Sequence, residues 1–213
     1  MKTLVNPNVN WLFQAEPSWG TNGRIIDIPR GKTLGGSSSI NGMVFNRGQS
    51  MDYDVWAQKG NKGWSYSDLL PYFKRYENRL GNHDETYRGT EGELPITDLD
   101  YKDPLCEAFI KGAIEEGIPL NNDYNGKSQE GVSYVQTTKK GRFRVSSARA
   151  FLNPVKSRKN LKIITNAFVT KINIENKIAT GVNYSKGGPR GQKLTLNANK
   201  EVILSSGVIK SPH

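Results

Sequence analysis

The spacing of apolar residues changes along the chain, and it predicts helices in the first part and strands in the last part. In residues 69–76, apolar side chains recur every three or four positions, which is typical of a helix with one buried face. In residues 168–174 they alternate with other residues, which is typical of a half-buried strand. The change falls near residue 161. A chain with both patterns is expected to have a mixed α and β fold of the α/β class.

Helices are predicted where the apolar spacing coincides with capping residues. The predicted helices cover residues 38–45, residues 51–58, a segment capped by Ser67, a segment from Asp103 to Gly117, and residues 146–152. The Asp103-Pro104 pair is a favourable start, because the carboxylate can cap the first turn and proline fits at the first helical position. Leu105 and Phe109 of this helix, with Cys106 between them, are expected to be buried.

Strands are predicted mainly after residue 160. The predicted strands cover residues 131–138, 161–165, 167–175, 178–185, 193–196 and 201–205. Residues 175–177 are expected to form a hairpin turn, and the glycine-rich residues 187–191 a looser one. Residues 202–204 are apolar without a break, which is typical of a strand buried in a parallel sheet. Residues 1–30 and 81–92 are expected to be largely irregular.

The most informative chemical pattern lies in residues 31–45, with the sequence GKTLGGSSSINGMVF. Two adjacent glycines are followed by three serines, and an Asn-Gly pair interrupts the apolar run. This pattern predicts a tight turn that leads into a helix, and its glycines let a large ligand approach the backbone. Exposed N–H groups at a helix start favour an anion. The residues alone therefore indicate a phosphate- or cofactor-binding loop.

The pattern continues through residues 46–56, NRGQSMDYDVW, and as a whole it resembles a signature of the glucose–methanol–choline (GMC) oxidoreductase family. Further similarities lie at residues 6–11, 63–75, 131–132, 146–152 and 201–207. The choline-dehydrogenase-like branch fits best, on residues 37–41 and 47–49. The resemblance implies an FAD-dependent enzyme that oxidises an alcohol to an aldehyde or ketone by hydride transfer to flavin N5.

Two parts of the family pattern have no counterpart in this sequence. No three glycines have the GxGxxG spacing that opens family members, and His213 does not match their C-terminal catalytic histidine. The chain is therefore expected to be a central fragment that is inactive by itself. It would join part of a Rossmann-like FAD-binding domain to part of a substrate-binding α+β domain. The expected division is residues 1–60 for the flavin-contacting portion, 61–155 for the substrate-domain portion, and 156–213 for a β-rich portion of the FAD-binding domain.

Candidate cofactor residues are carried over from the resemblance position by position. Thr33, Gly36 and Ser37 would lie beside the FAD, Asn41, Gly42, Met43 and Val44 would touch the isoalloxazine ring, and Val169 would contact the adenine end. Without the resemblance, Asn41 could equally be a helical residue bonded to its own backbone, and Val169 an ordinary strand residue. Ser206 and Gly207 are weaker candidates for contact with the cofactor, because they follow a predicted buried strand and a nucleotide often binds at the carboxyl edge of a sheet. Ile40 stands where some relatives bind FAD covalently through histidine, so the FAD is expected to be non-covalent. No catalytic residue is assigned within the chain.

The charge of the chain raises an alternative function. There are 30 Lys and Arg residues against 20 Asp and Glu residues, for a net charge of +10, which suits a module that binds nucleic acid or another polyanion. The basic runs at residues 139–144 and 156–159 lack the interleaved aromatic residues of a base-stacking surface. A solvated face is the simpler interpretation, and a nucleic-acid partner is not expected.

Other residue types exclude further classes of site. His83 and His213 have no partners at ligand spacing, so no metal site is predicted, and the single cysteine excludes an internal disulfide. No apolar run reaches the about 18–20 residues of a membrane helix.

A cytoplasmic location is expected, with peripheral contact to a membrane left open. The expected partners are a small alcohol (choline, aliphatic or aromatic) and an electron acceptor, either oxygen or a quinone-linked carrier.

Overall fold

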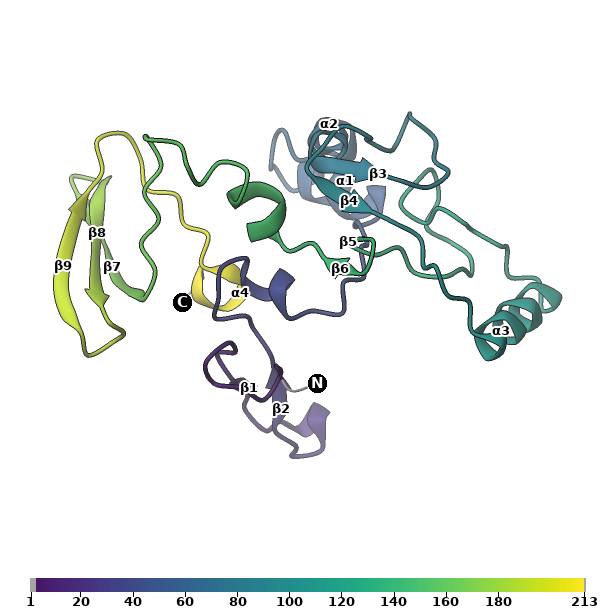
Figure 1. Cartoon of the computed structure of the whole chain (residues 1–213), viewed down its shortest axis with the longest axis horizontal. Coiled ribbons are helices and arrows are strands. Elements are labelled where there is room, and N and C mark those ends of the chain that lie inside the picture. Colours follow the sequence, from purple (N-terminus) through teal and green to yellow (C-terminus); the bar gives the residue numbers. More distant parts are fainter. Residues whose placement is uncertain (1–2, 213) are drawn as a thin grey trace. The chain divides into compact units, whose positions relative to one another are not determined.

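The computed structural model describes residues 3–212, and the chain forms two compact units that divide after Ser157 (Figure 1). His213 lies outside the described residues. The mixed α and β composition agrees with the predicted fold class. The assignment of residues 1–60 and 61–155 to different domains remains a prediction. None of the described helices could cross a bilayer, since the longest has 12 residues.

The first 30 residues contain a short hairpin that the sequence did not predict. β1 (Phe13–Ala15) pairs with β2 (Ile26–Ile28) in antiparallel register, and a single 3-10 turn at Trp19–Thr21 lies between them. The chain then reaches the glycine–serine segment, where the predicted helix over residues 38–45 is wrong. The structure forms only a short 3-10 helix at Gly36–Ser39. Serine and asparagine side chains bond nearby backbone groups in this segment, which competes with continued helix formation.

Three longer helices follow, largely as predicted. They are α1 (Ser50–Gln58), α2 (Tyr66–Tyr76) and α3 (Pro104–Glu115). Ser65, and not Ser67, caps α2, with its Oγ accepting the N–H of Asp68 at 3.2 Å. Asp103 caps α3 as predicted, and its Oδ1 accepts the N–H of Leu105 at 2.9 Å. α1 and α2 face each other through aromatic rings, which explains the apolar stripe of α2.

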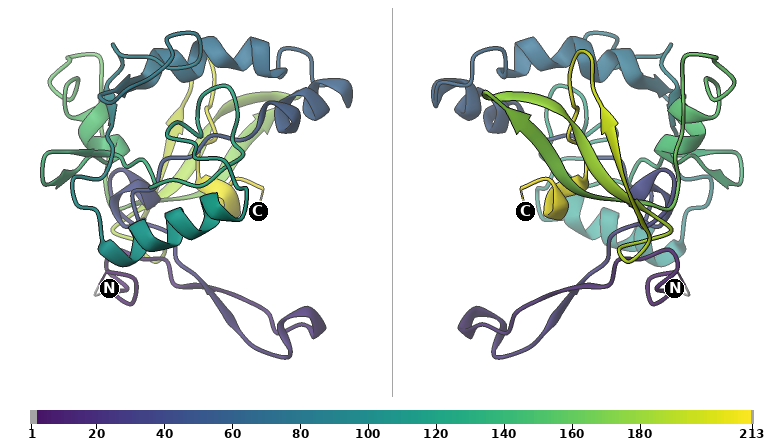
Figure 2. Two further views of the ribbon diagram at one scale, coloured as in Figure 1. Left: turned by 90° about the vertical axis from the view of Figure 1, so that its right-hand side faces the viewer. Right: turned by 90° about the vertical axis from the view of Figure 1, so that its left-hand side faces the viewer.

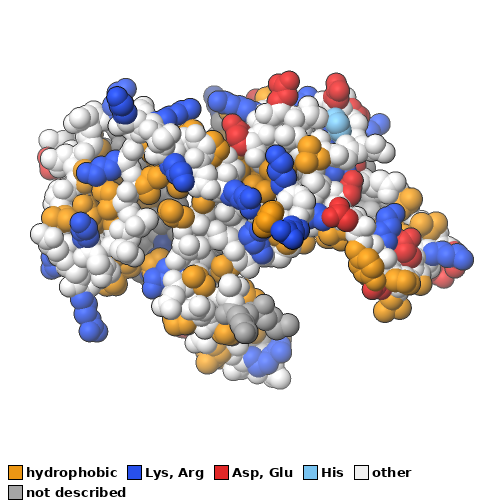
Figure 3. Space-filling view, in the orientation of Figure 1, with side chains coloured by type: hydrophobic (Ala, Val, Ile, Leu, Met, Phe, Trp, Pro, Cys, Tyr) orange, Lys and Arg blue, Asp and Glu red, His pale blue; other side chains and the backbone are white. Residues whose placement is uncertain are grey.

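The predicted burial of one face of α3 is wrong. Leu105 is 79% exposed and Phe109 is 73% exposed, and Cys106 is also exposed. Together with Val132 and Val135 they line an apolar groove of ≈ 490 Å³, and Figure 3 shows hydrophobic side chains gathered over α3. The helix pattern therefore identified an apolar face correctly, but little of the described chain covers that face.

Short strand pairs connect the helices. β3 (Glu77–Arg79) and β4 (Leu94–Ile96) pair in parallel, and β5 (Lys139–Lys140) and β6 (Phe143–Arg144) form a hairpin. The predicted strand over residues 131–138 is wrong, because this segment forms isolated bridges instead of a ladder. One of these bridges joins Thr137 to Val44, and another joins Thr137 to Thr97. The predicted helix at residues 146–152 is a five-residue π-helix at Ala148–Leu152.

The second unit is an antiparallel three-stranded sheet in the order β7–β8–β9 (Figure 2). Its strands are β7 (Ala167–Glu175), β8 (Ile178–Lys186) and β9 (Gln192–Asn197). Asn176 and Lys177 have φ of 49° and 66°, which is the geometry of a two-residue hairpin turn, as predicted.

The other two strands predicted for the second unit are wrong. Residues 161–165 and 201–205 are irregular, and the chain continues into the short helix α4 (Gly207–Lys210). Ile203 is 77% exposed. A buried strand needs neighbours on both sides, and the described residues supply none to this segment.

Candidate functional site

Close backbone contacts shape the glycine–serine turn, which we define as residues 31–39. The N–H of Gly31 donates to Ser37 Oγ at 3.1 Å. Gly35 and Gly36 have φ of 86° and 53°, a region in which glycine is favoured. A Cβ atom on Gly31 would lie 2.1 Å from the carbonyl oxygen of Gly36, far inside van der Waals contact. The turn therefore requires glycine at position 31.

Serine hydroxyls hold the turn together and tie it to a distant segment. Ser38 Oγ donates to the carbonyl of Gly35 at 2.5 Å and accepts the N–H of Ser147 at 2.8 Å. Ser39 Oγ donates to the carbonyl of Leu34 at 2.8 Å. The serines thus satisfy backbone groups inside the turn, and their side chains are already occupied by protein partners.

Asn41 follows the turn, and its side-chain oxygen accepts two hydrogen bonds. Its Oδ1 accepts the backbone N–H of Met43 at 3.0 Å and Nη1 of Arg144 at 2.7 Å. Met43 takes a left-handed φ of 64°, and both Asn41 and Gly42 are exposed. Asn41 therefore bonds its own backbone, as one of the two interpretations expected, but it does so in an open turn and not inside a helix.

Backbone hydrogen bonds join residues 43–45 to residues 136–138 of the first unit, and we call this connection the bridge. The N–H of Phe45 donates to the carbonyl of Gln136 at 2.9 Å, and the N–H of Thr138 donates to the carbonyl of Met43 at 3.0 Å. Phe45 is 8% exposed, whereas Val44 is 52% exposed. The backbone is therefore anchored while the side chain of Val44 stays accessible.

Seven of the eight candidate cofactor residues lie in one short stretch of sequence, in the turn and directly after it. They are Thr33, Gly36, Ser37, Asn41, Gly42, Met43 and Val44. Val169 lies in the second unit, in β7 opposite Tyr184, and is 53% exposed. Ser206 and Gly207 lie at the start of α4. Contact of these residues with a cofactor stays a prediction.

A buried ionic network next to this segment was missed by the sequence analysis. Glu77 lies between two arginines: its Oε2 accepts Nη2 of Arg47 at 2.7 Å and its Oε1 accepts Nε of Arg88 at 2.7 Å. The three side chains are 0–3% exposed. Nη1 of Arg88 also forms an ion pair with Asp123. Two positive and two negative groups thus balance each other in the interior.

Amide side chains connect this network to the bridge. Gln136 Oε1 accepts Nη1 of Arg88 at 3.1 Å and Nδ2 of Asn125 at 3.0 Å. Asn125 Nδ2 and the hydroxyl of Tyr124 both donate to the carbonyl of Phe45, at 3.2 Å and 2.8 Å. The network therefore fixes the backbone directly after the candidate ring-contacting residues. Arg47 lies inside the motif at residues 46–56, but its partners are too distant in sequence to be recognised there.

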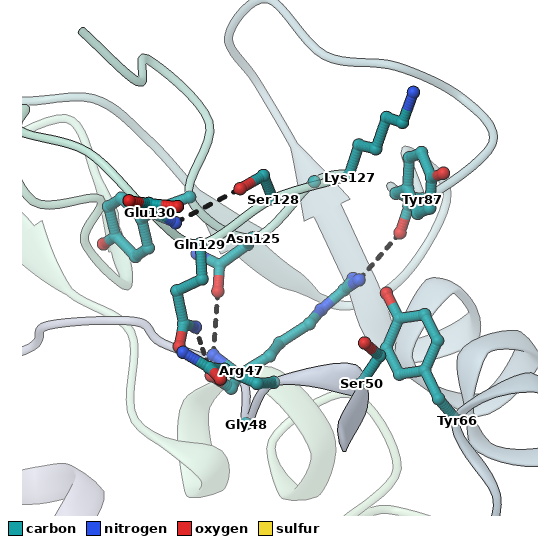
Figure 4. A pocket seen from close by; sticks show the side chains of 13 residues that line it. Arg47, Gly48, Ser50, Tyr66, Tyr87, Asn125, Lys127, Ser128, Gln129 and Glu130 are labelled. Carbon is teal, nitrogen blue, oxygen red and sulfur yellow. Dashed lines mark hydrogen bonds between the residues drawn. The ribbon is translucent and has the colours of Figure 1, made fainter. Parts of the chain in front are cut away.

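A polar cavity of ≈ 550 Å³ borders the network (Figure 4). The side chain of Arg47 runs past Tyr66 to the carbonyl of Tyr87, which accepts its Nη1 at 2.7 Å. Gln129 closes another side, and its Nε2 donates to the carbonyl of Arg47 at 2.8 Å. The segment Asn125 to Glu130 forms the remaining wall. The protein supplies partners for Nη1 and the carbonyl of Arg47, whereas its buried Nε has no hydrogen-bond partner among the described residues.

Several tyrosines of the first unit are shifted toward higher pKa. Burial is the main cause of the raised pKa of Tyr66, Tyr76 and Tyr124. Desolvation, and then the nearby carboxylate of Glu107, raise the pKa of Tyr134 to about 12. In each case the folded state favours the protonated phenol over the phenolate.

The stability of the chain is therefore expected to fall as the pH rises from about 10 toward about 12. The folded-state pKa values lie above the unfolded value of about 10, so this contribution is complete below pH 10 and is lost as the pH rises through the folded pKa. Urea unfolding at several alkaline pH values measures the loss. The variant Tyr134→Phe should lose less stability across this range than the parent, and equal losses would contradict the shift assigned to Tyr134.

The comparisons with known proteins identify the class. A family model for GMC oxidoreductases matches residues 9–213, and the chain therefore belongs to the GMC oxidoreductase family. It is 46% identical over 204 residues to the oxygen-dependent choline dehydrogenase of Sinorhizobium medicae, covering 95% of this chain and 36% of that protein. It is 44% identical over 204 residues to an alcohol dehydrogenase [acceptor] of Pseudomonas putida, covering 96% and 37%.

A solved structure supports the same fold. An FAD-dependent oxidoreductase from Chaetomium thermophilum superimposes with a TM-score of 0.81 at 28% identity, covering 92% of this chain and 38% of that one. The chain thus spans just over a third of the length of the curated relatives it matches. The predicted family and fold class are confirmed.

Proposed function

We propose that this chain is the flavin-holding part of an FAD-dependent enzyme that oxidises an alcohol to an aldehyde or ketone. Membership of the GMC family supports this, since its relatives include choline and alcohol dehydrogenases and an FAD-dependent oxidoreductase. The observation that carries the proposal is the anchored turn, which leaves Asn41, Gly42 and Val44 accessible on one short stretch.

The residues present fit a flat cofactor. A Cβ atom built on Gly36 or Gly42 meets no atom of the described chain within 4 Å, whereas a Cβ on Gly31 or Gly35 collides with the turn itself. Gly31 and Gly35 therefore allow the turn to close, and Gly36 and Gly42 leave open space beside their own backbone. A large planar group can approach the backbone at the open pair.

FAD, when bound, would accept the hydride that leaves the alcohol carbon. Asn41 would offer side-chain N–H donors to the ring, and Val44 would cover part of its face with an apolar side chain. Thr33 and Ser37 would lie beside the remainder of the cofactor, and Val169 would contact the adenine end. These groups hold and orient the cofactor, and a reduced flavin gathers negative charge that fixed donors stabilise.

The FAD is expected to be bound without a covalent link. Ile40 occupies the position where some relatives carry the attaching histidine, and isoleucine offers no nucleophilic atom. Acid precipitation of the flavin-loaded protein should release essentially all flavin into the supernatant, measured by its visible absorbance. Flavin that remained with the pellet would contradict this expectation.

No specific observation favours the alternative of a polyanion-binding module. The basic run at residues 139–144 is partly engaged with the protein: Lys139 pairs with Asp100 at 2.7 Å, and Arg144 bonds Asn41. These cations are not free to follow a phosphate backbone. The comparisons give the alternative no support.

Expression from the complete gene tests the proposed function. The purified protein should be yellow, and it should reduce a dye when choline, an aliphatic alcohol or an aromatic alcohol is added. Repeating the assay with oxygen and with a quinone analogue identifies the acceptor, and cell fractionation tests a cytoplasmic location against peripheral membrane contact. A colourless protein that takes up no added FAD would overturn the proposal.

A further inference from the structure

The guanidinium of Arg144 contacts the segment that carries the proposed flavin site. Arg144 lies in β6, and its Nη1 donates to Oδ1 of Asn41 at 2.7 Å and to the carbonyl of Ser38 at 3.2 Å. Asn41 lies 103 positions earlier in the sequence. A bond from a charged donor is stronger than a neutral one, so this contact links β6 firmly to the turn.

The two donors on Oδ1 fix the orientation of the Asn41 amide. The N–H of Met43 and the guanidinium of Arg144 use both acceptor positions of the oxygen. The side-chain nitrogen then lies on the opposite side of the amide, and Asn41 is an exposed residue. Among the described residues, none accepts a hydrogen bond from Asn41 Nδ2 in the structure. Its two N–H groups remain available to a ligand.

Arg144 is itself held in place. Its carbonyl accepts Nη1 of Arg149 at 3.3 Å, and it pairs with Lys139 in the β5–β6 hairpin. The neighbouring Arg142 has a different environment, because its guanidinium packs over the ring of Phe143 at 5.3 Å. The same hairpin therefore offers one arginine that bonds the turn and one that provides a matched control.

We propose that Arg144 is a positioning residue: it orients Asn41 so that the amide N–H groups face the flavin. This inference rests on the proposed function. The guanidinium also polarises the amide to which it donates, which strengthens the N–H donors on its far side. Preoriented donors of this kind stabilise negative charge on a bound ring without reorganising during the reaction.

Three variants of the protein expressed from its complete gene test the proposal. Arg144→Met should raise the Kd for FAD at least about fivefold, as expected when a bond worth about 1 kcal/mol is lost. It should also shift the visible absorption bands of the flavin that still binds. Arg144→Lys keeps the charge and should restore part of the affinity. Arg142→Met should leave the Kd and the bands unchanged.

Other results of these measurements separate failure of the positioning role from failure of the proposed function. If Arg144→Met binds FAD like the parent with unshifted bands, the positioning role is overturned and the proposed function stands. If the parent takes up no FAD, the proposed function fails, and hydrogen exchange of the Met43 amide decides the positioning role. Exchange at least about tenfold faster in Arg144→Met than in Arg142→Met would support it, and equal rates would overturn it.

Discussion

Replacement of Glu77 by glutamine is expected to lower the free energy of unfolding of the first unit by about 3–5 kcal/mol. Glu77 is fully buried and its two oxygens each accept a guanidinium N–H at 2.7 Å. Loss of its charge leaves Arg47 and Arg88 in the interior with Asp123 as the remaining counter-charge in the network. Removing one partner of a buried ion pair costs far more than the pair contributes, because an uncompensated charge stays desolvated.

Urea unfolding of the variant and the parent at neutral pH measures this effect. Glu115→Gln is a matched control, because it makes the same chemical change in an exposed pair with Lys111, whose Nζ lies 3.8 Å from the carboxylate. That control should lose no more than about 0.5 kcal/mol. If Glu77→Gln and Glu115→Gln unfold at the same urea concentration, the buried network does not carry the stability assigned to it.

The sequence could not predict this network, although it contains every member. Charged residues are usually exposed, so Arg47, Glu77 and Arg88 look like ordinary surface residues. The partners of Glu77 lie 30 positions before it and 11 positions after it, and neither spacing corresponds to a helix or strand contact. Only the tertiary fold brings these segments together.

Local signals explain which elements were predicted well. The cap and apolar spacing of α3, and the alternation in β7 with its two-residue turn to β8, are encoded within a few residues. Residues 131–138 and 201–205 have the composition of strands, but a strand also needs a partner at the correct position. Residues 38–45 failed for another reason, since Asn41 bonds the backbone of Met43 and ends any helix.

The sequence named candidate residues 33–44, and their contact with a cofactor stays a prediction. The glycine pattern also predicted a tight turn, which the structure has at residues 31–39. Arg144 was interpreted as part of a solvated basic run, because nothing in its neighbourhood indicates a bond to a residue 103 positions away. Long-range hydrogen bonds of this kind support the turn, and they could not be predicted from the sequence.

Gly31→Ala is expected to destroy the turn, and with it the binding of FAD. The new Cβ would lie 2.1 Å from the carbonyl oxygen of Gly36 and 2.8 Å from the backbone nitrogen of Ser37. Backbone atoms cannot move aside as a flexible side chain can, so the turn must open. Overpacking of this kind costs about 1–3 kcal/mol or more. Thermal unfolding should show lower stability, and flavin titration should show little or no binding.

Gly42→Ala is expected to weaken the binding of FAD without lowering the stability of the turn. Its Cβ would meet no atom of the described residues within 4 Å, and Gly42 has no positive φ that alanine would avoid. The stability should therefore change by less than about 0.5 kcal/mol, or rise slightly because alanine restricts the unfolded chain. The methyl group would occupy the space proposed for the ring, so the Kd for FAD should rise at least about tenfold.

The two glycine variants together separate folding of the turn from contact with the cofactor. A loss of FAD binding in Gly31→Ala alone would show only that the turn must close. A loss in Gly42→Ala at unchanged stability would support a ligand in the open space, because no atom of residues 3–212 lies within 4 Å of the new methyl group. Gly20→Ala, where the nearest atom is Ser18 Oγ at 4.0 Å, should change neither stability nor affinity. If Gly42→Ala binds FAD as tightly as the parent, the ring does not contact the backbone at position 42, and the placement of the flavin ring at this position is overturned.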